Sequence, residues 1–395
     1  MSQPDVYQAS LALHRQHQGK LGVQSLIPLK SREDLSLAYT PGVAEACREI
    51  VRNPAAVSDL TIQGRLVAVI SDGSAVLGLG NIGPAAALPV MEGKSLLLKE
   101  FGGVDSLPLV INTQDTEEII KFVRQVAPSF IGINLEDISA PRCFEIEERL
   151  QDIGIPVFHD DQQGTAIVVY AALQNAARVV GKPFADLRVV IVGAGAAGMA
   201  VAKMLLAIDT RGDQVTTLPA QRVRDVILVD SKGIVESGRA DVVGVKVMMA
   251  AQTNIDKRQG SLAVAMAGAD VIIGVAGPGL ITTAMVSAMA PKAIVMAMAN
   301  PTPEIMPNEA KAAGAAVVAT GRSDFPNQVN NVLAFPGIFR AVVRARLPRI
   351  TPAMRYAAAA ALAQTVAVPT AEAILPSPFL PNLAELVAQA VLDAA

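Results

Sequence analysis

The sequence has few of the features that mark secreted or nucleic-acid-binding proteins. Only two of its 395 residues are cysteines, Cys47 and Cys143, so no disulfide framework can form and a reducing compartment is favoured. The formal net charge is −3, which leaves no excess of basic side chains for a nucleic acid. Residues 1–18 lack the apolar core of a signal peptide. These absences predict a cytoplasmic protein with no nucleic-acid partner.

Long uncharged apolar runs are also missing, although 51% of the residues are hydrophobic. Of the two most apolar stretches, residues 187–208 contain a glycine cluster and Lys203, and residues 356–368 are too short to cross a bilayer. We therefore expect no membrane association and a globular protein with large buried sheets. A chain of 395 residues is long for one hydrophobic core, so two domains are expected.

Two pairs of acidic residues, Glu136-Asp137 and Asp160-Asp161, each follow a short apolar segment typical of a strand. A helix predicted over residues 143–150 separates them, and parallel strands bring their carboxyl ends to one edge of a sheet. Carboxylates gathered there without an obvious basic partner would repel one another, and a divalent cation relieves that repulsion. Hard oxygen ligands favour Mg²⁺ or Mn²⁺. The alternative is two solvated loop ends without a metal.

The strongest single motif is the glycine fingerprint Gly193-x-Gly195-x-x-Gly198. A strand of β-branched residues over 187–192 precedes it and an alanine-rich helix follows, as in dinucleotide-binding folds. The first glycine permits a tight turn, the second lets a pyrophosphate approach and the third lets the helix pack on the strand, while the start of the helix offers free amides. The motif therefore predicts that NAD or NADP binds at Gly193, Gly195, Ala196, Ala197 and Gly198.

A second predicted strand, residues 225–230, ends in Asp230, where an acid binds a free ribose 2′-hydroxyl and so favours NAD. It lies further along the chain than usual because residues 209–224 form a polar insertion. Lys232 and Lys246 favour the opposite choice, since a lysine can bind the 2′-phosphate of NADP. These opposed signals predict activity with both dinucleotides.

The second half of the chain continues with three predicted strands, over residues 270–275, 293–299 and 316–319, which alternate with helical segments. This alternation predicts a doubly wound parallel sheet. Asn300 follows one of these strands and Asn331 lies in a later polar loop, so both are candidates to bind substrate or nicotinamide. The alternative is that they only form turns.

A strand predicted over residues 66–71 opens the sheet of the first half and is followed by a glycine-rich loop, residues 72–84. The loop lacks the spacing of a dinucleotide fingerprint, so we interpret it as facing the substrate. Lys94 comes before a short strand expected over residues 96–99. A lysine that is partly desolvated near a metal has a lowered pKa and can act as a base, whereas the commoner fate is a solvated surface lysine.

Tyr39 is one of only four tyrosines and lies just before a helix expected to begin near Pro41. It is either a packing residue at a domain edge or part of a site. Residues 1–20 predict a short helix whose apolar stripe is too thin to fold alone, so we expect it to dock on a neighbour.

Together these features predict an α/β protein of two domains. Residues 1–160 form an N-terminal α/β domain that carries the metal and catalytic residues, and residues 161–395 form a Rossmann-type doubly wound parallel-sheet NAD(P)-binding domain with a helical tail. A dinucleotide beside a carboxylate metal site is typical of enzymes that oxidise a hydroxy acid, where the metal polarises the new carbonyl and stabilises the enolate left when carbon dioxide departs. The residues alone do not choose among malate, isocitrate and tartrate, and a non-catalytic dinucleotide-binding protein is the alternative class.

Over nearly its whole length the sequence resembles the malic enzyme family, and most closely its short bacterial form. The resemblance rests on seven motifs in order, at residues 38–43, 71–83, 92–94, 132–138, 158–165, 193–198 and 320–331. It implies divalent-metal-dependent oxidative decarboxylation of (S)-malate to pyruvate and carbon dioxide by a homodimer or higher homo-oligomer, with a slight preference for NADP.

The roles of individual residues follow from the same resemblance. It implies Tyr39 as general acid and Lys94 as general base. The metal ligands that it implies are Glu136, Asp137 and Asp161. It also implies that the substrate carboxylate or the nicotinamide amide is held by Asn300 and Asn331.

The chain departs from the wider family at two places. Ala75 stands where the large animal-type members carry an arginine for the substrate carboxylate; the short form also lacks it, so recognition falls to backbone groups, asparagines and the metal. Residues 376–382 replace an expected acid and base, which puts a salt bridge in the tail in doubt. Retention of Tyr39, Lys94 and the three acids argues against the non-catalytic alternative, because a dinucleotide sensor needs only the glycine loop.

Overall fold

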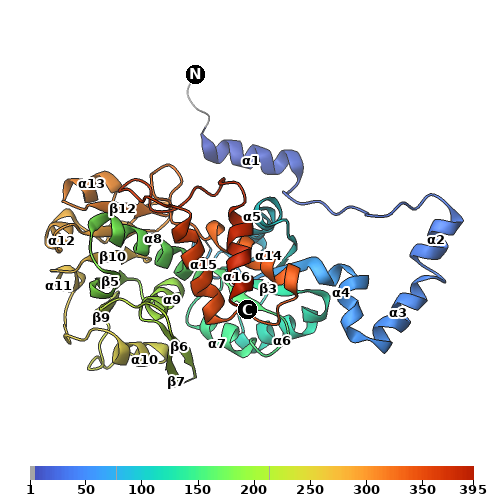
Figure 1. Cartoon of the computed structure of the whole chain (residues 1–395), viewed down its shortest axis with the longest axis horizontal. Coiled ribbons are helices and arrows are strands. Elements are labelled where there is room, and N and C mark those ends of the chain that lie inside the picture. Colours follow the sequence, from blue (N-terminus) through green and yellow to red (C-terminus); the bar gives the residue numbers. More distant parts are fainter. Residues whose placement is uncertain (1–4, 77, 213) are drawn as a thin grey trace.

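The computed structural model of the chain describes residues 5–76, 78–212 and 214–395. Leu77 of the glycine-rich motif, Asp213 of the polar insertion and the first four residues of the expected N-terminal helix lie outside the described residues. Figure 1 shows one sheet at the centre of the molecule and a second at its left, with helices around both. The predicted two-domain α/β class is confirmed.

The first sheet has four parallel strands in the spatial order β2-β1-β3-β4. Its strands are β1 (Leu66–Ser71), β2 (Asp105–Val110), β3 (Gly132–Leu135) and β4 (Val157–His159). Helices cover both faces, namely α6 (Thr116–Val126) and α7 (Arg142–Arg149) on one and α5 (Pro84–Gly102) and α14 (Phe335–Ala345) on the other. Burial on both faces explains why β1 is a continuous apolar run without polar alternation.

Helix α5 corrects one prediction, because residues 96–99 are helical and form no strand. The helix begins at Pro84, a first-turn position where the missing backbone N–H has no intrahelical partner to lose, and runs for 19 residues. Met91 and Leu98 are fully buried in the core beside the first sheet. The apolar run that suggested a strand therefore belongs to a buried helix, because a short apolar run does not distinguish the two. As a result, Lys94 lies in the middle of a helix.

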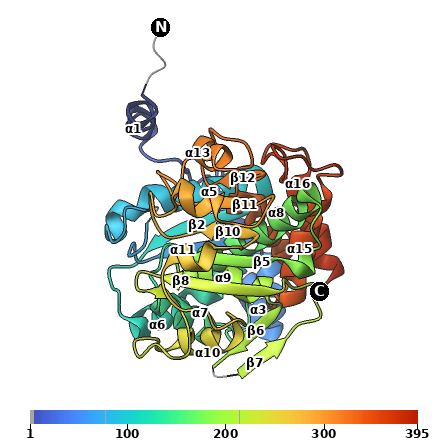
Figure 2. The ribbon, with the colours of Figure 1, turned by 90° about the vertical axis from the view of Figure 1, so that its left-hand side faces the viewer.

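The second sheet has six strands in the order β12-β11-β10-β5-β8-β9, with β9 antiparallel and the others parallel. They are β5 (Arg188–Val192), β8 (Asp225–Asp230), β9 (Gly233–Ile234), β10 (Val271–Gly274), β11 (Ile294–Ala297) and β12 (Val317–Thr320). Figure 2 shows the five parallel strands one below another. The polar insertion forms an antiparallel hairpin of β6 (Ile208–Arg211) and β7 (Gln214–Thr217). The predicted doubly wound parallel sheet is confirmed.

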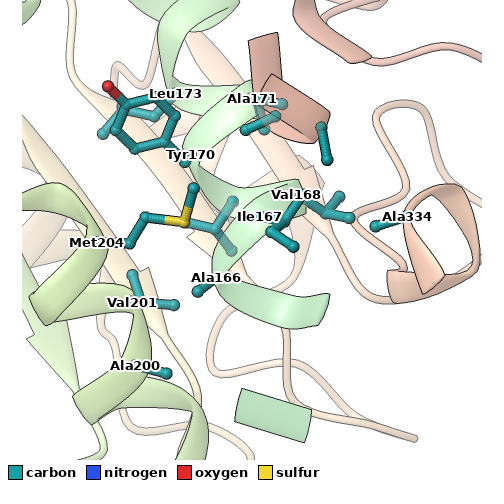
Figure 3. Packing of buried hydrophobic residues seen from close by; sticks show 14 of the residues in the cluster. Ala166, Ile167, Val168, Tyr170, Ala171, Leu173, Ala200, Val201, Met204 and Ala334 are labelled. Atoms are coloured by element: carbon teal, nitrogen blue, oxygen red, sulfur yellow. The ribbon is translucent and has the colours of Figure 1, made fainter. Parts of the chain in front are cut away.

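Helices cover both faces of the second sheet as well. One face carries α8 (Thr165–Val180), α9 (Ala196–Leu205), α10 (Val245–Gln252) and α15 (Pro352–Gln364), and the other carries α11 (Leu262–Met266), α12 (Thr283–Ser287) and α13 (Pro307–Ala312). Figure 3 shows Ile167 and Tyr170 of α8 beside Val201 and Met204 of α9. Each large apolar side chain buried in this way contributes about 1.5–3 kcal/mol. Although α8 is so apolar, no helix in the described part of the chain is long and apolar enough to cross a bilayer.

The last helices of the chain return to the first sheet. Phe339 of α14 meets Phe158 edge-on, with ring centroids 5.9 Å apart, and α16 (Leu383–Asp393) packs on both α14 and α15. Glu385 pairs with Arg340 at 2.8 Å and with Arg344 at 2.7 Å, so the tail does form a salt bridge, further along than residues 376–382. These contacts tie the first sheet to the second.

The N-terminal helices α1 (Val6–His17), α2 (Arg32–Ala38) and α3 (Val43–Arg52) contain no buried residue. Figure 1 shows α2 and α3 projecting at the right of the molecule, with α1 above it. A short helix, α4 (Val57–Leu60), leads back to the first sheet. Large apolar side chains are exposed along this N-terminal segment, among them Tyr7, Leu26, Ile27, Leu29, Leu37 and Tyr39. Exposed apolar groups in such number mark an interaction surface.

Candidate active site

The acid cluster forms where β3 and β4 end side by side. The last residues of these strands pair in parallel register, so Glu136 and Asp160 are the next residues on adjacent strands. One carboxylate oxygen each from Glu136, Asp137 and Asp161 lie within 4.8 Å of one another. The backbone N–H of Asp137 also donates to Asp161 Oδ2 at 2.8 Å. The structure therefore brings together the acids that the sequence placed at one sheet edge.

A five-residue π-helix, Asp160–Gly164, joins β4 to α8 and carries the second acid pair. It ends on a glycine because a Cβ added to Gly164 would lie 1.9 Å from Asp160 Oδ1. π-Helical turns are rare and occur frequently at functional sites. The role of Gly164 was not foreseen; the only sequence signal was the polar string between Asp161 and α8.

Lys94 reaches the acid cluster from the middle of α5. Its Nζ lies 2.5 Å from Asp160 Oδ2 and 3.1 Å from Glu136 Oε1, and the ammonium stands 4.8 Å from the centre of the Phe335 ring. The expectation that these acids lack a basic partner is therefore wrong. Lys94 lies 66 residues before Asp160, so only the packing of α5 on the first sheet reveals the pair.

The charges of the cluster set the protonation of Lys94. Burial by itself lowers the pKa of this amine, but the carboxylates of Asp160, Glu136 and Asp161 outweigh burial and raise the pKa above the usual lysine range. The sequence predicted a lowered pKa for Lys94. That prediction is wrong, because the carboxylates of the chain itself raise this pKa. Burial also raises the pKa of Glu136 well above its usual value, and it raises the pKa of Asp160 despite the neighbouring lysine.

Glu136, Asp137 and Asp161 fit the donor set of a hard divalent cation. Two of the three are buried, where the single positive charge of Lys94 does not balance the negative charge of the cluster, and the Asp161 side chain is 33% exposed. Asn134 donates from Nδ2 to Glu136 Oε2 at 2.9 Å and so orients that carboxylate from behind. Asp137 has φ +55°, a conformation that is uncommon for a residue other than glycine. Oxygen ligands of this kind suit Mg²⁺ or Mn²⁺.

The glycine-rich loop after β1 is anchored by Arg142, which no sequence motif indicated. Buried Asp72 accepts hydrogen bonds from the N–H and Oγ of Ser74, at 3.0 and 2.6 Å, and Arg142 Nη1 lies 3.1 Å from its other oxygen. The N–H of Ala75 donates to the carbonyl of Asp137 at 2.9 Å. These contacts hold the loop beside the acid cluster.

The two candidate asparagines lie at different places around the cluster. Asn331 begins a short 3₁₀ turn beside the π-helix, where a Cβ added to Gly164 would lie 3.2 Å from Asn331 Cβ. Asn300 is exposed after β11, and its backbone carbonyl packs against Gly78 of the glycine-rich loop. The structure thus places Asn331 next to the acids, and Asn300 where the second sheet meets the loop of the first domain.

The glycine fingerprint lies at the carboxyl end of β5 and shapes the start of α9. Gly193 has φ +114°, and a Cβ there would lie 2.6 Å from a backbone carbonyl oxygen. A Cβ on Gly198 would lie 1.8 Å from the carbonyl oxygen of Gly193, so helix and turn are in contact. Gly195, by contrast, faces open space, and Ala196 and Ala197 are the first residues of the helix. This geometry suits a turn that admits a pyrophosphate.

Asp230, at the end of β8, is paired with two cations. Arg239 donates to both carboxylate oxygens, at 2.9 and 3.2 Å, and Lys246 Nζ lies 2.7 Å from Oδ2. Partial burial acts to raise the pKa of Asp230, but the hydrogen bonds from Arg239 and Lys246 outweigh it and lower that pKa to about 2. Lys232 instead pairs with Asp241 at 3.2 Å. Arg239 was not foreseen, and it bridges Asp230 and Asp241, because its Nη2 also donates to Asp241 Oδ2 at 2.7 Å.

Tyr39 lies far from the acid cluster of its own chain. It follows the last residue of α2, on the projecting N-terminal segment, and is 66% exposed. Figure 1 shows α2 at the right edge of the molecule, whereas α5, which carries Lys94, lies near its centre. A single chain therefore does not bring Tyr39 and Lys94 together.

Fold and site together define a class of protein: two α/β domains, one with a dinucleotide-type sheet and the other with a carboxylate–lysine cluster at the edge of its sheet. Residues 18–151 match the family described as "Malic enzyme, N-terminal domain", and residues 162–395 match "Malic enzyme, NAD binding domain". The chain belongs to the malic enzyme family and is an oxidoreductase of that family. The resemblance seen in the sequence is confirmed.

Relatives of this family match along nearly the full chain. The bifunctional malic/malolactic enzyme of Bacillus subtilis is 50% identical over 390 residues, which cover 98% of this chain and 92% of that protein. The NADP-dependent malic enzyme of Halomonas elongata is 45% identical over 98% of this chain and 93% of that protein. The crystal structure of an NAD-dependent malic enzyme from Thermotoga maritima has a TM-score of 0.91 and 43% identity, over 98% of this chain and 99% of that chain.

Proposed function

We propose that this protein catalyses the divalent-metal-dependent oxidative decarboxylation of (S)-malate to pyruvate and carbon dioxide, with reduction of NAD⁺ or NADP⁺. The observation that carries the proposal is the contact of Lys94 with Glu136 and Asp160, beside two further acids at the same sheet edge. The names of its relatives, which are NAD- and NADP-dependent malic enzymes, support the same reaction.

The metal ligands in this proposal are Glu136, Asp137 and Asp161, which would hold Mg²⁺ or Mn²⁺. When bound, the cation supplies Lewis acidity at the substrate oxygen on C2. Asn134 keeps Glu136 oriented through its 2.9 Å hydrogen bond. The Asp161 side chain is 33% exposed, so the cluster is open to solvent at this acid.

Lys94 accepts the proton of the malate 2-hydroxyl as hydride leaves C2. Asp160 and Glu136 fix the position of its Nζ, at 2.5 and 3.1 Å. Because these carboxylates favour the ammonium form, the amine becomes a base only when their charge is offset, which is one reason why the proposal includes a divalent cation. Acid–base assistance of this kind contributes on the order of 10²–10⁴ in rate.

Tyr39 acts from a second copy of the chain, in a homodimer or a higher homo-oligomer, and donates the proton that C3 takes up to give pyruvate. Two observations support this arrangement. Tyr39 is remote from Lys94 within one chain, and α1, α2 and α3 expose apolar side chains that have no cover in the single chain. A partner chain would bury these side chains and receive the tyrosine.

Both dinucleotides are substrates in this proposal, with a slight preference for NADP. Arg239 and Lys246 offset the negative charge of Asp230, and a paired acid repels a 2′-phosphate less than an unpaired acid would. The pyrophosphate lies at Gly193, Gly195 and the start of α9. Asn300 and Asn331 hold the substrate carboxylate or the nicotinamide amide.

One assay tests the reaction. Malate, isocitrate and tartrate are each supplied with NAD⁺ or NADP⁺, with and without Mn²⁺, and reduced cofactor and carbon dioxide are measured. We expect both products from malate, and only when Mn²⁺ is present. Faster turnover of another hydroxy acid, or full malate turnover in chelator, would reject the proposal. The cytoplasmic location stays a separate prediction.

A further inference from the structure

The π-helix that carries Asp160 and Asp161 has a second, polar side. Its residues Gln162 and Gln163 line a cleft of about 1340 Å³ between α7, α9, α10 and α15. Neither Lys94 nor any of the four acids lines this cleft. The π-helix therefore separates two compartments, the acid cluster on one side and the cleft on the other.

Side chains from two further elements meet at Gln163. Its Nε2 donates to Glu147 of α7, at 3.2 Å to Oε1 and 3.4 Å to Oε2. Its Oε1 accepts a hydrogen bond from Nη1 of Arg355 on α15. Glu147 also accepts, at 3.4 Å, from the backbone N–H of His159, the last residue of β4. The contacts join a C-terminal helix, the π-helix and a helix of the first sheet.

These contacts form a partly buried polar unit at the wall of the cleft. Burial raises the pKa of Glu147, against the opposing effects of the Arg355 charge and of the hydrogen bonds from Gln163 and the His159 backbone. Arg355 is 21% exposed and lies 3.8 Å from Asp209. Because each member is held by hydrogen bonds to the others, removal of one member affects the positions of the others.

The π-helix depends on such outside contacts. Its i→i+5 bonding is rare because the turn is less favourable than an α-helix, so side chains must hold it in place. Gln162 is 4% exposed and its Nε2 has no hydrogen-bond partner among the described residues, so it does not anchor the turn through that amide. Gln163 is thus the side chain that fixes the turn from the cleft.

We propose that Arg355 and Glu147 are positioning residues that act through Gln163 to hold the π-helix where Asp161 reaches Glu136 and Asp137. The inference rests on the proposed metal-dependent function and adds two residues that lie outside every motif of the sequence. Gln163 follows Asp161 by two residues in one tight turn, so a rotation that releases Gln163 also moves the Asp161 carboxylate. Outer contacts of metal ligands typically contribute roughly 10–100-fold to metal affinity or activity.

Mn²⁺ binding to the full-length protein, measured without substrate by loss of the free Mn²⁺ signal in electron paramagnetic resonance, tests the proposal. Arg355→Ala and Glu147→Ala should each weaken Mn²⁺ binding about tenfold. Glu147→Gln keeps an oxygen acceptor for the Gln163 amide and should bind as the wild type does. In turnover assays the alanine variants should need more Mn²⁺ for half-maximal rate, with kcat near that of the wild type at saturating Mn²⁺.

Gln252→Ala is the matched control, because Gln252 lines the same cleft and makes no hydrogen bond to Glu147, Gln163 or Arg355. It should bind Mn²⁺ as the wild type does. Thermal unfolding identifies the folded variants, and Arg355→Gln serves as a second test of the same contact. Folded Arg355→Ala or Arg355→Gln protein that binds Mn²⁺ as tightly as the wild type overturns the positioning role.

Asp161→Asn separates this inference from the proposed function. If the wild type binds Mn²⁺ no better than Asp161→Asn does, the metal assignment is rejected and the positioning role falls with it. If the wild type binds far better than Asp161→Asn, and Arg355→Ala equals the wild type, the metal assignment stands and the positioning role alone is rejected.

Discussion

The two sheets of this protein end in edges of different chemistry. The edge of the first sheet is made of charged side chains, with Lys94 between Glu136 and Asp160. The edge of the second is made of backbone. Gly193 and Gly198 pack so closely against neighbouring carbonyl groups that a Cβ on either glycine would overlap them. A charge can be removed by an isosteric substitution that leaves packing intact, whereas a close backbone approach is lost when a single Cβ is added. Substitutions at the first edge should therefore act through lost charge, and substitutions at the second edge through steric overlap.

The largest effect is expected from removal of one charge at the first edge. Asp161→Asn should reduce malate turnover to background, because a carboxylate of the cation site is lost, while NAD(P) binding stays near that of the wild type. Turnover with saturating Mn²⁺ and cofactor titration by fluorescence measure the two quantities. Asp152→Asn, at a surface acid of the same domain, is the control. Full activity of Asp161→Asn in chelator would contradict the metal assignment.

Loss of the acid–base groups should follow in size. Lys94→Ala and Tyr39→Phe should each lower malate turnover by a factor on the order of 10²–10⁴ while cofactor and Mn²⁺ still bind. The first should fail at malate oxidation and the second at proton uptake into pyruvate, measured by deuterium incorporation. Lys99→Ala, at an exposed lysine of the same helix, should have little effect. Pyruvate exchange at the wild-type rate in Tyr39→Phe would make the tyrosine structural.

A mixture of the same two variants tests which chain supplies Tyr39. If the tyrosine serves a partner's site, co-assembled Tyr39→Phe and Lys94→Ala subunits form some sites with both groups intact, and activity returns. The expected result is partial recovery after the two variants are unfolded and refolded together, relative to each variant treated alone. No recovery from mixed oligomers would place both residues in one subunit.

The second edge should fail through sterics. Gly198→Ala places a Cβ 1.8 Å from the carbonyl oxygen of Gly193. Overpacking of this kind costs about 1–3 kcal/mol, or roughly 5- to 150-fold in affinity if the strain falls on the cofactor turn. Cofactor titration should show that loss, with Mn²⁺ binding unchanged. Gly195→Ala, where the Cβ meets open space, should keep the wild-type melting temperature and still weaken cofactor binding.

The smallest effect concerns the choice of dinucleotide. Lys246→Gln should weaken NADP binding about tenfold, close to 1.4 kcal/mol, and change NAD binding less, because a charge-assisted contact to the 2′-phosphate is lost. Lys232→Gln is the matched comparison, since Lys232 pairs with Asp241 and does not contact Asp230 through its ammonium. A wild-type preference for NAD above roughly a hundredfold, about 2.7 kcal/mol, would show that neither lysine binds the cofactor.

Most of the fold could be predicted from the sequence because its signals are local. The strand at residues 66–71 and the strand at residues 225–230 match β1 and β8, and the fingerprint at residues 193–198 opens α9 as expected. Residues 96–99 were assigned to the wrong element, because a short apolar run looks alike in a buried strand and a buried helix.

The sequence by itself determined which candidate residues lie at each edge, since strand ends and glycine spacing are local patterns in consecutive residues. Only the tertiary structure decided how they are paired. Lys94 meets Asp160 across 66 residues of chain, and Arg355 meets Gln163 across 192. The physical reason is that pairings of this kind, and the pKa values that follow from them, depend on how helices pack on sheets. No local pattern records that packing.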